Sequence, residues 1–287
     1  MRHFCAILAL ALLASTAAAA TTEEMFAAGK KAFTSGELDK AVDLFEKAVK
    51  AQPANADYHY WLGNAYGRMA QSANLFKQAS LAKKTQASFE RAVALDPIHL
   101  EARYSLLEYY MIAPGIMGGS EEKALQQASE IKKRDTIFGH RSFARIYTIQ
   151  KKPDLARKEY LDAIRDNPAS AEARHYYGMF LTNQKDYKAA LDEFESAARM
   201  EFMPAYFRIG VVAVLSESAL PRGEEALKKY LAHTPGENEP SLARAWYWLG
   251  QAHEKQGRRT DARNSYARSL QLAPGAKDVT AALKRVS

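Results

Sequence analysis

The sequence has 287 residues, of which 47% are hydrophobic and 25% are charged, and its 40 basic side chains outnumber 33 acidic ones. This composition is ordinary for a folded soluble protein, and a total of 15 Gly and 10 Pro leaves little room for disordered linkers. The basic residues fall in short runs in different parts of the chain, which is typical of a solvated helix surface.

The chain begins with the pattern of a processing segment. Arg2 supplies a positive charge, residues 4–13 are apolar, and Ala18 to Ala20 form a small-residue cleavage site. The apolar run is shorter than the roughly 20 residues that span a bilayer, so we expect cleavage after Ala20 rather than an uncleaved anchor. Cleavage would also remove Cys5, the only cysteine. We therefore expect an exported, periplasmic protein with no membrane span in its mature chain, for which nucleic acid is an improbable partner.

The rest of the chain repeats at a spacing of about 34 residues, most clearly in 243–276. The residues that carry the pattern are Trp246, Leu249, Gly250 and His253 on one helix face, and Ala262, Tyr266 and Ser269 on a second. Gly257 separates the two helices and Pro274 ends the pair. The spacing resembles the tetratricopeptide repeat (TPR), and it implies an all-α, right-handed α-solenoid of about seven helix hairpins.

Along the chain, the pattern predicts seven repeats and a capping helix. The ranges are about 22–55, 56–99, 100–136, 137–170, 171–202, 203–242 and 243–276, followed by the cap at 277–287. The second repeat closes ten residues late, and helical spacing within its insertion predicts an extended second helix from about Leu75 to Leu95, one end of which should project. A longer first helix with a helical corner is the open alternative.

The third repeat carries a five-residue insertion within the loop at 113–120. Ser120 has the character of a helix N-cap, and Glu121 and Glu122 complement the helix dipole. These two carboxylates, and the absence of a following Gly-Lys-Ser/Thr, favour a shaped loop over a phosphate site. The loop is also similar to one in uncharacterised Gram-negative envelope TPR proteins. The roles of this loop and of the insertion near 67–85 stay open.

No catalytic motif is present. The sequence lacks a G-x-S-x-G elbow, an H-E-x-x-H pair, a C-x-x-C motif and a P-loop. His253 and Glu254 begin like a zinc motif but lack the second His. We therefore expect a protein that is not an enzyme and that has no cofactor and no metal.

The TPR resemblance implies that first helices line a concave face where peptides or helices of partners bind. The predicted groove residues are Tyr60, Trp61, Asn64, Tyr104, Glu108, Arg141, Arg145, His175, Tyr176, Met179, Phe207, Arg208, Tyr247, Trp248 and Gln251. Arg141 and Arg145 are four apart, so we expect them to grip a carboxylate of the partner together. The alternative is that the aromatic residues of this row pack against the next repeat.

Two functions follow as hypotheses. The first is a non-enzymatic periplasmic scaffold that binds a peptide or helical segment of a partner envelope protein in the concave groove. The second is recognition of acidic glycan or lipid headgroups by a basic surface. Binding that collapses as salt rises would favour the second, because exposed charges are screened over about 8 to 10 Å.

Overall fold

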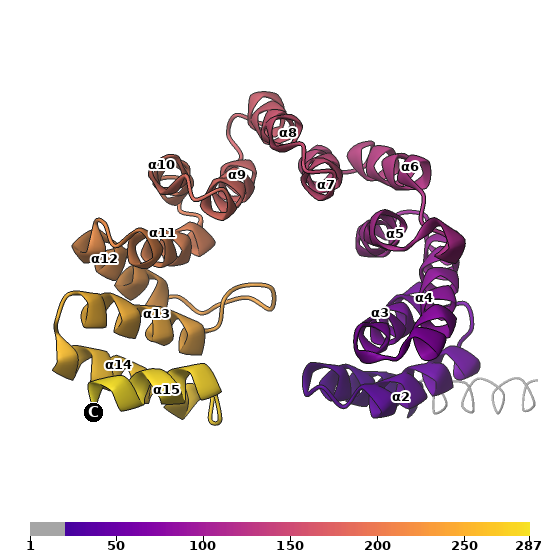
Figure 1. The fold of residues 1–287 in the computed structure, drawn as a ribbon, viewed down its shortest axis with the longest axis horizontal. Helices are drawn as coiled ribbons and strands as arrows, with labels where there is room; N and C mark the ends of the chain where they lie inside the picture. The colour runs from indigo at the N-terminus through magenta and orange to yellow at the C-terminus, as the bar shows by residue number, and fades with distance from the viewer. Residues whose placement is uncertain (1–20) are drawn as a thin grey trace, which may run out of the picture. The chain divides into compact units, whose positions relative to one another are not determined.

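The computed structural model of the chain describes residues 21–287, and the expected processing segment at 1–20 lies outside them. Within the described residues every regular element is a helix, which confirms the all-α prediction (Figure 1). The chain folds into two compact units, which divide in sequence between Lys152 and Pro153. In each unit consecutive helices pack as hairpins, as expected for stacked repeats. The division falls inside the predicted fourth repeat.

Unit 1 runs to Lys152. Residues 21–34 are helical, and the helices that follow are α2 (Leu38–Ala51), α3 (Ala56–Ser72), α4 (Leu75–Leu95), α5 (Leu100–Ile112), the 3-10 helix η1 (Gly115–Met117), α6 (Glu121–Lys132) and α7 (Thr136–Ile149). One part of its core packs Phe45 of α2 against Leu62 of α3, and another packs Phe89 of α4 against Leu107 of α5. The core therefore passes from one hairpin to the next.

Unit 2 begins at Pro153. Its helices are α8 (Pro153–Asp166), α9 (Ala171–Asn183), α10 (Tyr187–Ala198), α11 (Met203–Ser216), α12 (Leu220–Leu231), α13 (Leu242–Lys255), α14 (Arg259–Leu272) and α15 (Lys277–Val286). In α15, Val279 and Val286 are buried against Tyr266 of α14, whereas Lys284 and Arg285 are exposed. The predicted capping helix is therefore confirmed.

Glycines let the two helices of a hairpin touch. A Cβ added to Gly63 would lie 2.6 Å from the ring of Phe89, and one added to Gly250 would lie 2.5 Å from the ring of Tyr266. Each ring thus fills the space that a side chain on the facing helix would occupy. The same small-against-large pairing recurs along the chain, which explains why the repeat alternates Gly or Ala with aromatic residues.

The α3–α4 hairpin departs most from the repeat. The predicted helix from Leu75 to Leu95 is confirmed, with 21 residues. The open alternative also holds in part, since α3 has 17 residues against 13 or 14 for other first helices such as α5 and α7. Only two residues separate α3 from α4, and the side chain of Asn74 caps α4 by accepting the backbone N–H of Lys77 at 3.1 Å. At the tip of this hairpin, Leu75 and Phe76 are exposed.

Candidate binding pocket

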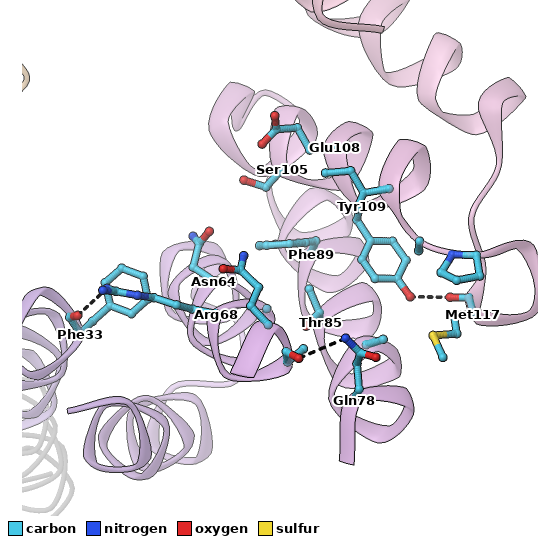
Figure 2. A pocket seen from close by; sticks show the side chains of 17 residues that line it. Phe33, Asn64, Arg68, Gln78, Thr85, Phe89, Ser105, Glu108, Tyr109 and Met117 are labelled. Carbon is cyan, nitrogen blue, oxygen red and sulfur yellow. Dashed lines mark hydrogen bonds between the residues drawn. The ribbon is translucent and has the colours of Figure 1, made fainter. Parts of the chain in front are cut away.

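A pocket of about 580 Å³ opens in unit 1 between α3, α4, α5 and the loop that contains η1 (Figure 2). Its lining is mainly apolar. The lining residues are Phe33; Asn64, Gly67, Arg68, Ala70 and Gln71 of α3; Gln78, Ala82, Thr85 and Phe89 of α4; Ser105, Glu108, Tyr109 and Ile112 of α5; and Ala113, Pro114 and Met117 of the loop. Its volume lies within the range of about 300 to 1,000 Å³ that is usual for ligand sites in proteins.

Both insertions that interrupt the repeat meet in this pocket. Residues 67–85 supply one wall, and residues 113–117 supply part of the opposite side. An ordinary helix hairpin would end before Gln78 and Met117 could face each other. The pocket is therefore a feature that this chain adds to the repeat architecture.

Hydrogen bonds within the chain fix the walls. Figure 2 shows the hydroxyl of Tyr109 donating to the backbone carbonyl of Met117, which ties the loop to α5. Gln78 Nε2 donates to the carbonyl of Ala70 at 3.4 Å and joins the ends of α3 and α4. Arg68 donates to the carbonyl of Phe33 at 2.8 Å, and its guanidinium lies 5.0 Å from the centre of that ring. The pocket is thus braced on three sides before anything binds.

Glycine is required at the end of the loop. Gly118 has a φ of +93°, in the left-handed region. A Cβ on Gly119 would lie 1.8 Å from the carbonyl oxygen of Ala113. The side chain of Ser120 then accepts the backbone N–H of Lys123 at 3.3 Å, which confirms the predicted N-cap of α6. The sequence of this loop therefore encodes a defined shape.

Large apolar side chains surround the opening. Leu75 is 78% exposed and Phe76 91% exposed at the start of α4, and Ile112 is 66% exposed and Ile116 91% exposed beside the loop. Ile112 lines the pocket itself, Ile116 precedes the lining residue Met117, and Leu75 and Phe76 lie three and two positions before the lining residue Gln78. A cluster of exposed apolar side chains of this size marks an interaction site more often than an ordinary surface.

The excess of positive charge in unit 1 comes from the α3–α4 hairpin. Residues 58–89 contain four basic and no acidic side chains, whereas the rest of 21–152 contains fifteen of each. The four are Arg68, Lys77, Lys83 and Lys84, all of them exposed. Of these four, Arg68 lines the pocket, and the acidic Glu108 belongs to the same lining.

The structure brings two of the predicted groove residues into the pocket. Asn64 and Glu108 line it. Tyr60 and Trp61 instead pack on their neighbours: the Tyr60 ring lies 6.2 Å from that of Phe89, and Trp61 contacts Phe26, Phe33 and Phe45. Here the alternative of packing between repeats holds.

The two predicted arginines do not act as a pair of open clamps. Arg145 Nε donates to Glu108 Oε1 at 2.8 Å, so its charge is already matched within unit 1. The Arg141 guanidinium lies 4.3 Å from the centre of the Phe138 ring and 5.5 Å from that of Tyr104. The ion pair with Glu108 was not foreseen because its two residues lie 37 positions apart on different repeats.

In unit 2 two predicted contacts need correction. His175 and Phe207 are only 7% and 4% exposed, because Phe194 and Phe202 enclose the imidazole and Tyr230 packs on the phenyl ring. Neither side chain can line an open groove. Burial, with the nearby charge of Arg208, lowers the pKa of His175 to about 3, so the imidazole is neutral at physiological pH.

The other predicted groove residues of unit 2 are partly exposed. They are Tyr176, Met179, Arg208, Tyr247, Trp248 and Gln251. Burial lowers the pKa of Arg208. Tyr247 packs against Tyr266 at 6.0 Å between ring centres, and Arg244 covers its ring at 4.6 Å. A pocket in unit 2 is lined by other residues, among them Arg199 and Lys229.

Residues 21–287 contain no candidate metal site and no candidate membrane span. No group of three or more His, Cys, Asp or Glu side chains in this range is placed to hold a metal ion. None of the helices described combines the length and hydropathy of a bilayer span.

Comparison with known proteins identifies the repeat. Models of the tetratricopeptide repeat match residues 29–69, 146–201 and 243–276. The chain contains tetratricopeptide repeats. Proteins with this fold are generally binding scaffolds for other proteins rather than enzymes. Comparison with curated proteins gives no match.

Solved TPR structures share the fold. A TPR protein from Parabacteroides merdae is 15% identical, with a TM-score of 0.50 over 92% of this chain and 98% of its own. Yeast Tom70 is 15% identical, with a TM-score of 0.57 over 86% of this chain and 59% of its own. A human IFIT1 dimer with PPP-AAAA is 17% identical, with a TM-score of 0.55 over 87% and 59%. This TPR chain thus spans about three fifths of Tom70 and IFIT1, and these likenesses concern the fold.

Proposed function

We propose that this TPR protein is a non-enzymatic scaffold that binds a segment of a partner protein, and that the unit 1 pocket is the main contact. The observation that carries the proposal is the preformed apolar pocket with Leu75, Phe76, Ile112 and Ile116 exposed at its rim. Burying such side chains in a partner removes apolar surface from water, which is the main favourable term in protein association. Asn64 and Glu108, two of the predicted groove residues, line this pocket.

We further propose that the protein works in the periplasm and that its partner is an envelope protein. The support is the sequence pattern of residues 1–20, with Arg2, an apolar run and a small-residue cleavage site. Protein purified from cells should then have Thr21 as its first residue. A chain that still begins at Met1 and is extracted only by detergent would show that residues 1–20 are an uncleaved anchor.

The binding proposal is tested by crosslinking in living cells. A photoreactive amino acid is placed at Ile112, on the rim of the pocket, and in a matched variant at Leu155, an exposed apolar residue of α8 in unit 2. We expect a discrete protein adduct from Ile112 and none from Leu155. Equal adducts from both positions, or none from Ile112, contradict a binding site in the pocket.

A further inference from the structure

We propose that the segment held in the unit 1 pocket is an amphipathic helix whose apolar face enters the pocket and whose flanking side chains are acidic. This inference rests on the proposed function and adds the chemistry of the partner. Three observations carry it: the hydrogen bonds already made by the pocket walls, the length of the pocket along α4, and the charge of the α3–α4 hairpin.

The walls leave little for an extended backbone to bond. Asn64 Nδ2 donates to the carbonyl of Tyr60 at 3.1 Å, Gln78 Nε2 donates to that of Ala70 at 3.4 Å, and Thr85 Oγ1 donates to that of Leu81 at 2.8 Å. Every element around the pocket is helical, so no strand edge is present there. An extended peptide would therefore leave N–H and C=O groups unpaired against an apolar wall, whereas a helix satisfies its own.

The pocket has the dimensions of a short helix. Lining residues follow α4 from Gln78 to Phe89, eleven residues or about 16 Å at 1.5 Å per residue. That length matches about three turns of a partner helix, whose apolar side chains recur at every third or fourth position. Phe76 and Ile116, one from each side of the opening, would then cover the flanks of the bound helix.

The charge of the hairpin selects an acidic partner. Lys77 and Lys83 make no ion pair within the described residues, and Arg68 uses its guanidinium on a neutral backbone carbonyl. Helices α3 and α4 together carry five basic and two acidic side chains, Asp57 and Glu90, and of their lysines only Lys84 has an ion pair within 21–287, with Glu46 at 3.8 Å. Acidic flanks on the bound helix would complement this surface and orient the helix. A second copy of this chain is disfavoured as occupant, because its own hairpin is equally basic.

The test uses three synthetic peptides with the same apolar residues and the protein as isolated from cells. One is an amphipathic helix with Glu flanks, the second has Lys in place of Glu, and the third is the Glu peptide reordered to destroy the apolar face. Affinity is measured by fluorescence anisotropy, and circular dichroism follows helix formation on mixing. We expect the first peptide to gain helix and to bind at least ten-fold more tightly than the other two.

Two variants and one matched control locate the binding. Lys77→Glu with Lys83→Glu should weaken the Glu peptide at least ten-fold and strengthen the Lys peptide, whereas Lys188→Glu with Lys277→Glu, on exposed positions of unit 2, should change neither. Ala82→Phe, which fills the pocket, should weaken the Glu peptide to a similar extent. Circular dichroism and thermal melting check that each variant is folded. If Ala82→Phe does not fold, the variant at the exposed Lys77 and Lys83 still decides the test.

Several outcomes overturn the inference. They are equal binding of the reordered peptide, preference for the Lys peptide, binding of anionic lipid vesicles through Lys77 and Lys83 in place of the peptide, and a dimer of this chain that buries Phe76. If Ile112 still crosslinks to a protein in cells, the scaffold function stands and only the acidic helix is refuted. If Ile112 captures no protein, the function itself fails.

Discussion

At the scale of single residues, close contact between the two helices of a hairpin depends on glycine, which has no side chain. Gly210 of α11 shows this most sharply, since a Cβ there would lie 2.2 Å from Leu227 Cγ of α12. Leu227 is completely buried and has no room to withdraw. The glycine is therefore a packing residue, and its tolerance to substitution measures how tightly the hairpin closes.

We expect Gly210→Leu to lower the free energy of unfolding of unit 2 by about 1 to 3 kcal/mol or more, as is usual for overpacking in a core. Because stacked repeats contact only their neighbours, hydrogen exchange should rise first in α10 to α13 and only later in α15. Ala281→Leu, at an exposed position of α15, is the control and should leave exchange unchanged. Uniform loosening of unit 2 contradicts this local picture.

Tyrosines form a second residue-scale pattern, one that links successive repeats. Tyr66 donates its hydroxyl to Glu46 and Tyr110 donates to Glu90, in each case across 20 positions. Burial, together with the acceptor carboxylate, raises the pKa of both tyrosines, so they remain protonated donors. Both pairs have the same spacing of 20 positions, so these hydrogen bonds could be predicted from the sequence once the repeat is recognised.

At the scale of helices, a network around Glu224 joins α12, α13 and the start of α14. Lys228 Nζ donates to Glu224 at 2.7 Å, Gln256 Nε2 donates at 3.2 Å, and Arg258 donates as well. His253 Nε2 lies 3.4 Å from the same carboxylate. Burial by itself would raise the pKa of Glu224, but these partners lower it from 4.5 to about 2.

This network makes unit 2 sensitive to acid. A carboxyl whose pKa falls on folding stabilises the folded state above its unfolded pKa, and that contribution is lost as pH falls from about 4.5 to about 2. We expect Glu224→Gln to lower the free energy of unfolding at pH 7 by about 1 to 3 kcal/mol. The free energy of unfolding of this variant should then fall less between pH 7 and pH 3 than that of the unmodified protein. Urea titration of both proteins at the two pH values checks this, and equal acid sensitivity contradicts it.

Helices were also the scale at which sequence reasoning succeeded best. The bounds of α4, the N-cap at Ser120 and the capping helix followed from periodicity and local chemistry, both of which act within a few residues. The pocket did not follow, because it depends on two insertions in adjacent repeats that face each other. The burial of His175 and Phe207 also depends on residues distant in sequence, because side chains from α10, α12 and the α10–α11 turn enclose them.

At the scale of the whole molecule, exposed apolar side chains are unevenly distributed. Among the described residues, every large apolar side chain that is more than half exposed lies in unit 1, and those of unit 2 reach only 47%. The five in unit 1 are Leu75, Phe76, Ile98, Ile112 and Ile116. The most exposed apolar surface of the described residues therefore lies in unit 1.

We expect Phe76→Ser with Ile116→Ser to leave the melting temperature unchanged, because two side chains that are 91% exposed contribute little to the core. The same change should weaken binding of the Glu peptide, because it removes apolar surface beside the pocket. Calorimetry measures the first effect and fluorescence anisotropy the second. A melting temperature several degrees lower shows that these side chains pack in the folded state.

The rim residues lie outside the repeat core, so the constraints of folding and of binding act on different residues. Gly63 and Phe89 hold the α3–α4 hairpin closed, whereas Phe76 and Ile116 face solvent and are free of that folding constraint. We therefore expect substitutions at Phe76 and Ile116 to change what the pocket binds while the packing of the hairpin is kept.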